Sequence, residues 1–379
     1  MNIKTLLKWG SSLKIALSCL FLLFVLVLIG TLAQVDLGIY LVQKRFFQSW
    51  FVWWQPISGL SLPVFPGGFL LGSILIANVF SVLITRLIPK WKNVGLIFIH
   101  VGLILLLFGS GVNSVLTTES QMTIEEGETK LYSQSTREVE LFIVDTSHPT
   151  QDVVTSFPQE YIEKETMLSH HSLPFEMKVV TYLPNSKLDI RMETQTSQIA
   201  TQGMGLQLLA SPLPYFVRDD LMNHPTVFLE VMYHGNSEGI WLLSSLIETP
   251  QMVTVGDKRF QMAVRYKRYY NDYSLKLLDF SHDVYLGSDI PKNYSSRIFL
   301  SDKERKESRE VLIYMNHPLR YQGKTYYQAS FGKNDTLTVL QVVENPGWFM
   351  PYLATLLMSI GLVVHFLYRL TLFARKRKQ

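Results

Sequence analysis

The stretch "FIHVGLILLLFG", residues 98–109, places a single histidine inside an apolar run that extends over residues 94–116. A run of this length suits a helix that crosses the hydrocarbon core of a membrane. His100 would lie about 10 Å inside the run, at roughly 1.5 Å per residue from its nearer end. Because an ionisable side chain at that depth is costly unless it has a partner, His100 indicates a functional site.

Three further apolar runs occupy residues 15–33, 67–87 and 348–370. With the run around His100 they predict four membrane-spanning α-helices. The first three helices form an N-terminal membrane region, residues 1–116, and the fourth lies with a basic tail in residues 346–379.

Basic residues flank these runs, and they favour the cytoplasmic side of a membrane. They are Lys4, Lys8, Lys14, Arg86, Lys90, Lys92 and Arg369, followed by the tail "RKRKQ". Their positions predict a multi-pass protein of the cytoplasmic (inner) membrane with both termini in the cytoplasm. Residues 117–345 would then form a large domain outside, on the periplasmic side.

The first apolar run allows two interpretations. The tripeptide "TLA" before Gln34 resembles a signal-peptidase site, so the run could be a cleaved signal. The run is longer than a usual signal-peptide core, and an uncleaved anchor makes the number of spans even. We therefore expect an anchor.

The loop after this run carries "FFQSWFVWWQP", with Trp50, Trp53 and Trp54 close together. Tryptophan rings suit the headgroup zone of a membrane, which predicts an interfacial helix at the outer surface. The alternative is a platform that contacts haem or a partner protein.

Residues 117–345 are predicted to form an extracytoplasmic all-β, sandwich-like domain inserted between the third and fourth helices. Short segments rich in β-branched and aromatic residues recur there between turn residues. They are "VELFIV", "FEMKVVTYLP", "TVFLEVMYHG", "FQMAVRYKRYY", "VLIYMN", "KTYYQASF" and "LTVLQVVE". The first and last strands would join the third and fourth spans directly.

Composition excludes several functions. The net charge of +4 is not gathered into a basic stripe, so we expect no nucleic-acid partner. The single cysteine, Cys19, excludes an internal disulfide, a CxxC pair and a CxxCH haem-attachment motif. No motif of a hydrolase, metalloprotease or nucleotide-binding loop is present, and we predict no catalytic residue. The histidines of the outer domain lack metal-ligand spacing; they are His148, His170, His171, His224, His234, His282 and His317.

Two histidines lie within apolar runs, and each has more than one interpretation. His365 is shallow enough to reach the interface, whereas His100 is too deep and needs a partner. A cross-helix hydrogen bond to Asn78 or Ser81 would be purely structural. Haem is the other candidate, because its macrocycle is apolar and its iron accepts axial imidazoles. We predict His100 as an axial ligand and His365 as a weaker candidate for haem binding, with iron held through haem only.

Glycines in the third run form a stripe that bears on this choice. Gly95, Gly102 and Gly109 recur every seventh residue, and such stripes allow close helix contact. His100 lies about 160° around the helix from Gly102. If the stripe packs against one of the chain's own spans, His100 faces away from that span, toward another subunit or a cofactor.

The sequence resembles the ResB (CcsB) family of system II cytochrome c biogenesis proteins. The resemblance is carried, in order, by "GTLAQ", "FFQSW", "LPVFPGG", "FIHVGLILLLFG", "MTIEEGE", "YLGSDIPKNYSSRIFLSD", "MNHPLRYQGKTYYQASF" and "NPGWFMPY". These segments are spread over nearly the whole chain.

The resemblance implies a haem-handling subunit that helps to export haem b and attach it to the CxxCH motifs of apocytochrome c. It implies a ResC/CcsA-type multi-span partner, apocytochrome c as substrate, and a thiol-reducing thioredoxin-like protein. Haem b would be a transported substrate, His100 would be the haem-associated residue, and the chain would be an accessory subunit of a haem lyase. Alternatives from other classes are a membrane assembly scaffold or a transporter subunit with a structural histidine.

Overall fold

The computed structural model describes residues 3–57, 60–87, 89–147, 152–164, 166–191, 199–216, 221–285, 287, 291–332 and 335–377. The chain divides into two compact units. Helices from both ends of the sequence form the first unit, Met1–Thr118 with Glu344–Gln379. The second unit, Glu119–Phe216 with Asp220–Val343, consists mainly of strands.

Within its described residues, the first unit contains five α-helices: α1 (Ile3–Gly10), α2 (Leu13–Val42), α3 (Gly68–Thr85), α4 (Val94–Leu116) and α6 (Met350–Arg377). A π-helical turn, η1 (Gln43–Phe47), follows α2, and a 3₁₀ turn, η2 (Trp91–Asn93), precedes α4. All except α1 belong to segments long and apolar enough to cross a membrane. A helix satisfies its own backbone groups, as a lipid environment requires. The predicted combination of four apolar helices and a large all-β region is confirmed.

Two helices extend beyond the apolar runs that predicted them. The helix α2 continues to Val42, past residue 33, with a break in helical dihedrals at Gly38 (φ 70°, ψ 166°). The helix α6 continues through Arg375, Lys376 and Arg377, past residue 370. Cations stabilise the C-terminal end of a helix, so hydrogen bonding continues where the apolar run stops.

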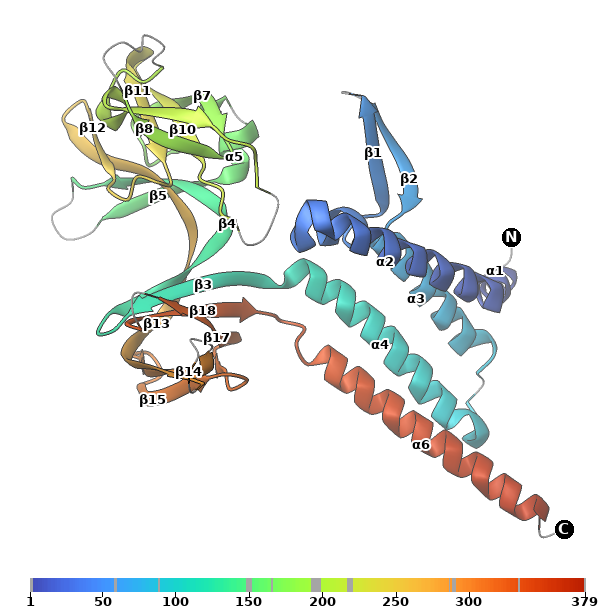
Figure 1. Cartoon of the computed structure of the whole chain (residues 1–379). Helices are drawn as coiled ribbons and strands as arrows, with labels where there is room; N and C mark the ends of the chain where they lie inside the picture. Colours follow the sequence, from blue (N-terminus) through green and yellow to red (C-terminus); the bar gives the residue numbers. More distant parts are fainter. Residues whose placement is uncertain are drawn as a thin grey trace. The chain divides into compact units, whose positions relative to one another are not determined.

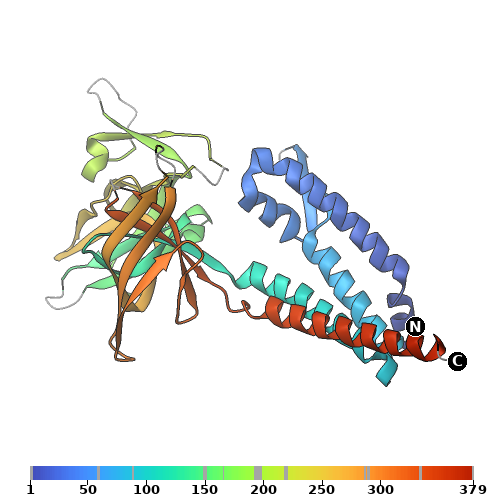
Figure 2. The same cartoon turned by 60° about the horizontal axis from the view of Figure 1, so that its bottom comes forward.

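The helices α4 and α6 lie side by side in both views (Figures 1 and 2). The contact follows the glycine stripe, since Gly95, Gly102 and Gly109 are all buried. A Cβ atom built on Gly102 would lie 2.6 Å from Met358 Cγ and 2.8 Å from the Ala354 carbonyl oxygen. The stripe therefore packs against one of the chain's own spans.

The tryptophan-rich loop is a β-hairpin, so the prediction of an interfacial helix there is wrong. Strand β1 (Phe51–Ile57) pairs with β2 (Leu60–Pro66), with Phe51 opposite Pro66 and Val52 opposite Phe65. Aromatic and β-branched residues favour extended backbone, and prolines within the segment prevent a continuous helix.

The second unit contains sixteen strands among the described residues, with the short helix α5 (Gln159–Lys164) and the 3₁₀ turn η3 (Gly203–Leu206). The strands are β3 (Thr118–Glu125), β4 (Thr129–Asp145), β5 (Val153–Pro158), β6 (Met167–Leu168), β7 (Glu176–Leu183), β8 (Ser186–Ile190), β9 (Leu208–Pro212), β10 (Thr226–Tyr233), β11 (Asn236–Ser244), β12 (Gln251–Val255), β13 (Lys258–Val284), β14 (Pro291–Asp302), β15 (Glu307–Tyr314), β16 (Leu319–Tyr321), β17 (Lys324–Gly332) and β18 (Leu337–Glu344). Each of the seven segments predicted as strands overlaps one of them, and at β7, β10 and β15 the segment extends past the strand by at most two residues.

Three sheets organise these strands. The largest has the order β15-β14-β13-β4-β3-β18-β17-β16, with β12 added to β13 and β5 to β4. A second sheet has the order β11-β10-β7-β6, and β8 pairs with β9 alone. Strand β3 follows α4 and β18 precedes α6 in the chain, so both strands that join the helices are neighbours in the largest sheet.

Among the described residues the unit has two main hydrophobic cores, and the long strand β13 contributes to both. In the first core, Val139–Ile143 of β4 and Phe260–Val264 of β13 pack against β7, β10 and β11. This core lies between two sheets, as the sandwich-like prediction requires. The second core is formed by residues of the largest sheet alone, including Leu275, Leu300 and Leu340, so this sheet curls around its own apolar face.

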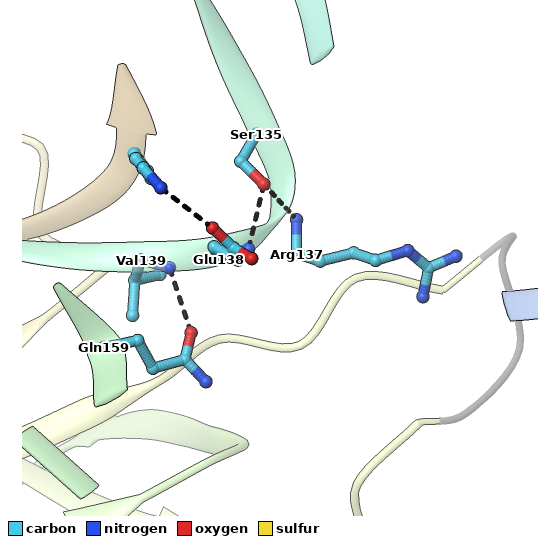
Figure 3. A network of polar contacts seen from close by, with 6 residues as sticks. Ser135, Arg137, Glu138, Val139 and Gln159 are labelled. Atoms are coloured by element: carbon cyan, nitrogen blue, oxygen red, sulfur yellow. Dashed lines mark hydrogen bonds and ion pairs between the residues drawn. The ribbon is translucent and has the colours of Figure 1, made fainter. Parts of the chain in front are cut away.

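Strand β4 bends at residues 135–138 (Figure 3). Tyr266 pairs with Val139 and Arg268 pairs with Gln134, so residues 135–138 of β4 face Lys267 alone. The Ser135 hydroxyl accepts hydrogen bonds from the backbone N–H groups of Arg137 (3.2 Å) and Glu138 (3.0 Å). Residues 135–138 thus form a β-bulge, in which a side-chain oxygen accepts the hydrogen bonds that backbone N–H groups do not make to a neighbouring strand.

Candidate functional site

The candidate site is centred on His100, a half-buried residue in α4. Its Nδ1 atom lies 2.8 Å from the backbone carbonyl oxygen of Leu96, one helical turn earlier. A carbonyl oxygen can only accept, so Nδ1 carries the proton and donates it. The lone pair of the neutral ring is then on Nε2, which is the atom available to a metal.

The structural alternative for His100 named a hydrogen bond to Asn78 or Ser81, and neither is formed. Asn78 Nδ2 donates to the carbonyl oxygens of Gly10 (2.6 Å) and Ser12 (3.0 Å), which holds α3 against the turn between α1 and α2. Ser81 Oγ donates to Ala77 O at 2.7 Å within its own helix. Within the part of the chain that the structure describes, His100 Nε2 has no hydrogen-bond partner.

The glycine stripe fixes the direction of His100 relative to α6. Gly102 faces Ala354 and Met358 of α6, and Gly109 faces Met350. Since His100 lies about 160° around α4 from Gly102, its side chain leaves the helix on the side away from α6.

His365 lies at the contact between α4 and α6. A Cβ atom built on Gly95 would be 2.7 Å from the His365 backbone nitrogen and 2.9 Å from its Cβ. The Nδ1 atom of His365 is buried and has no hydrogen-bond partner among the described residues. This imidazole therefore has an unsatisfied nitrogen beside the helix crossing.

The structure does not bring the two membrane histidines together. His365 touches α4 at Gly95, and His100 lies about 140° around the helix from that residue at roughly 100° per residue. One haem iron with two axial histidines needs an imidazole on each face of the porphyrin. Here the backbone of α4 stands between the two residues.

The other histidines do not form a metal centre in the described residues, where no group of three or more candidate metal ligands occurs. The rings of His170 and His171 lie 4.1 Å apart, and His170 Nδ1 lies 2.7 Å from Ser172 Oγ. His282 Nδ1 lies 3.1 Å from Asp335 Oδ2. His148 is outside the described residues.

A buried polar network in the second core was not predicted from the sequence. The Tyr321 hydroxyl donates to Asp302 Oδ2 (2.8 Å) and lies 3.0 Å from Glu307 Oε2, which ties β16 to β14 and β15. Hydrogen bonds to Asp302, first from the backbone N–H of Arg305, hold the pKa of that carboxyl below its usual range. Burial, and then the two carboxylates, raise the pKa of Tyr321 to about 12. The network stabilises the fold and offers no site open to a ligand.

Comparison with known proteins finds a match to one family. Residues 244–339 match the ResB-like family, a stretch from the end of β11 to the start of β18. The chain is also 24% identical over 269 residues to Protein NrfI of Wolinella succinogenes, an alignment that covers 70% of this chain. The chain spans 26% of the length of that protein. The predicted family resemblance is confirmed, and the family match lies outside α4 and His100.

Proposed function

We propose that the chain acts in cytochrome c biogenesis as a membrane subunit that handles haem, because residues 244–339 match the ResB-like family. The observation that carries the proposal is the state of His100 in α4. Its Nδ1 donates to Leu96 O, and its Nε2 has no partner among the described residues of this apolar helix and its surroundings. A neutral imidazole in this state is a suitable axial ligand for haem iron.

Haem b would be cargo rather than a resident cofactor. Its macrocycle is apolar, so a site beside apolar helices costs little desolvation, while His100 Nε2 would bind the iron. Since His365 lies on a different side of α4, the second axial ligand would come from another protein. A ResC/CcsA-type multi-span partner is the natural source, as expected from the family resemblance.

The β unit would contact apocytochrome c and the partner, with thiols kept reduced by a thioredoxin-like protein. Attachment joins the two cysteine thiols of a CxxCH motif to the two haem vinyl groups. The reacting groups belong to haem and apocytochrome, so we assign this chain a supporting role without a catalytic residue. The helices would lie in the cytoplasmic membrane, with both termini inside and the β unit outside.

Visible spectroscopy of the full chain, purified with and without its partner, tests the haem proposal. Wild type should show a Soret band, which His100→Ala should lose and added imidazole should restore. His365→Ala is the matched control, since it removes the other membrane histidine, and it should keep the band. Wild type without haem, together with normal c-type cytochromes in cells carrying His100→Ala, would contradict the proposal and favour an assembly scaffold.

A further inference from the structure

The hairpin of β1 and β2, here called the aromatic hairpin, exposes large apolar side chains on both faces. Trp53 is 58% exposed and Trp54 is 57% exposed. Adjacent residues of a strand point to opposite faces, so no apolar face of this ribbon is covered by the described residues. On β2, Leu62 and Val64 are also exposed.

Such a hairpin is not expected to be stable in water. A two-stranded ribbon has little independent stability, and contiguous exposed apolar surface marks an interaction site. The hairpin therefore needs an apolar or amphipathic environment that the described residues do not supply.

The base of the hairpin is attached firmly to the helices. The Gly67 backbone N–H donates to Trp50 O at 2.9 Å, and that of Phe69 donates to Ser49 O at 3.2 Å. The rings of Trp50 and Phe69 are 6.4 Å apart. The hairpin thus follows the end of α2 and η1 and leads into the start of α3 (Figure 1).

Charge near this base favours a phospholipid surface. Lys44 and Arg45 in η1 are exposed, and neither forms an ion pair among the residues that the structure describes. The sequence contains no Asp or Glu between Asp36 and Glu119. Basic side chains attract anionic headgroups, and tryptophan prefers the headgroup level of a bilayer.

We propose that the aromatic hairpin lies in the headgroup zone of the bilayer, with Lys44 and Arg45 binding phosphate groups of anionic phospholipid. This fixes the ends of α2 and α3 at the membrane surface. The proposal concerns a surface separate from His100, so it does not depend on haem binding.

Nitroxide labels on the full chain can test this placement in vesicles of phosphatidylcholine and phosphatidylglycerol. In a Cys19→Ser background, the label is placed by Val64→Cys on the hairpin. Leu28→Cys in the middle of α2 gives a lipid reference, and Ser237→Cys on the exposed end of β11 gives a water reference. Collision rates with oxygen and with a water-soluble nickel chelate are then measured.

The ratio of oxygen to nickel collisions at Val64 should lie between the two references and several-fold above that of Ser237. A ratio equal to that of Ser237 would place the hairpin in water, and one equal to that of Leu28 would place it in the hydrocarbon core. Low collision rates with both reagents would mean cover by protein. Each of these three results would overturn the proposal.

The charge requirement is tested in the same experiment. The label at Val64 should lie deeper when phosphatidylglycerol is present than in phosphatidylcholine alone. The double variant Lys44→Gln, Arg45→Gln should lose this shift, whereas the matched double variant Lys90→Gln, Lys92→Gln should keep it. A shift that survives in the first variant would rule out phosphate binding by this pair.

Discussion

Asp302 is a carboxylate that is only 1% exposed, and its charge is supported entirely by hydrogen bonds. The Arg305 backbone N–H donates to Oδ1 at 2.9 Å, and Tyr321 and Gln322 donate to Oδ2 at 2.8 Å. Because these donors lower the pKa in the folded state, they stabilise the fold above the unfolded-state pKa of about 3.9. That stabilisation is lost as the pH falls through the lowered folded-state pKa.

Replacement Asp302→Asn should therefore lower the melting temperature at pH 7, because an amide NH₂ group faces donors that need an acceptor. The difference from wild type should narrow in acid, as Asp302 itself becomes protonated. Near-UV circular dichroism from pH 7 to pH 3 measures both effects. Asp279→Asn is the control, since that carboxylate is half exposed in its pair with Arg297 and should matter little. A constant difference across the pH range would contradict this account.

The sequence was sufficient to predict His100 as the unusual residue but not its hydrogen-bonded state. A histidine in an apolar run is visible in the sequence, whereas its partner is the backbone oxygen of Leu96, which every residue type supplies. The network around Asp302 was missed for a related reason. Asp302, Glu307 and Tyr321 are ordinary polar residues in the sequence, and only the pairing of their strands brings them together.

At the scale of the element, the contact between α4 and α6 depends on residues that have no side chain. Replacement Gly102→Val should place methyl groups against Met358 and the Ala354 carbonyl, and overpacking of this kind costs about 1–3 kcal/mol. We expect a lower thermal stability of the purified full chain and a weaker disulfide cross-link between cysteines introduced on facing positions of α4 and α6.

The matched control for this prediction is Gly111→Ala on the same helix. A Cβ atom built on Gly111 meets nothing within 4 Å, so this substitution should leave stability and cross-linking unchanged. Equal losses in the two variants would mean that backbone flexibility, rather than close helix contact, explains the glycines of α4.

The apolar runs predicted helices well where the need to satisfy backbone hydrogen bonds within an apolar segment is enough to decide the structure. The helix α4 begins and ends at the predicted residues, 94 and 116. Prediction failed at the aromatic hairpin, because tryptophan suits an interface in either a helix or a strand, and pairing with β2 decides between them. It also did not foresee how far β13 continues, since the predicted segment covers residues 260–270 and the strand extends to Val284.

At the scale of the whole molecule, the two units have different origins of stability. The β unit buries two cores that share the strand β13, so unfolding of one core removes support from the other. The helices bury little of their apolar surface inside the chain, which fits lipid or partner contacts around them. The family match lies in the β unit, which indicates that relatives share this unit over at least residues 244–339.

The number of spans leads to a prediction about the two sides of the membrane. With the β unit inserted between the third and fourth spans, the α3–α4 loop and the end of α6 should share one side, and the β unit should occupy the other. In a Cys19→Ser background, intact cells treated with a membrane-impermeant maleimide should be labelled at Ser237→Cys. Two other cysteines should be labelled only after the membrane is opened. They are Trp91→Cys, at a position 89% exposed between α3 and α4, and Arg375→Cys in the last turn of α6. Labelling of Trp91→Cys in intact cells would reverse the orientation, and different results at Trp91→Cys and Arg375→Cys would change the number of spans.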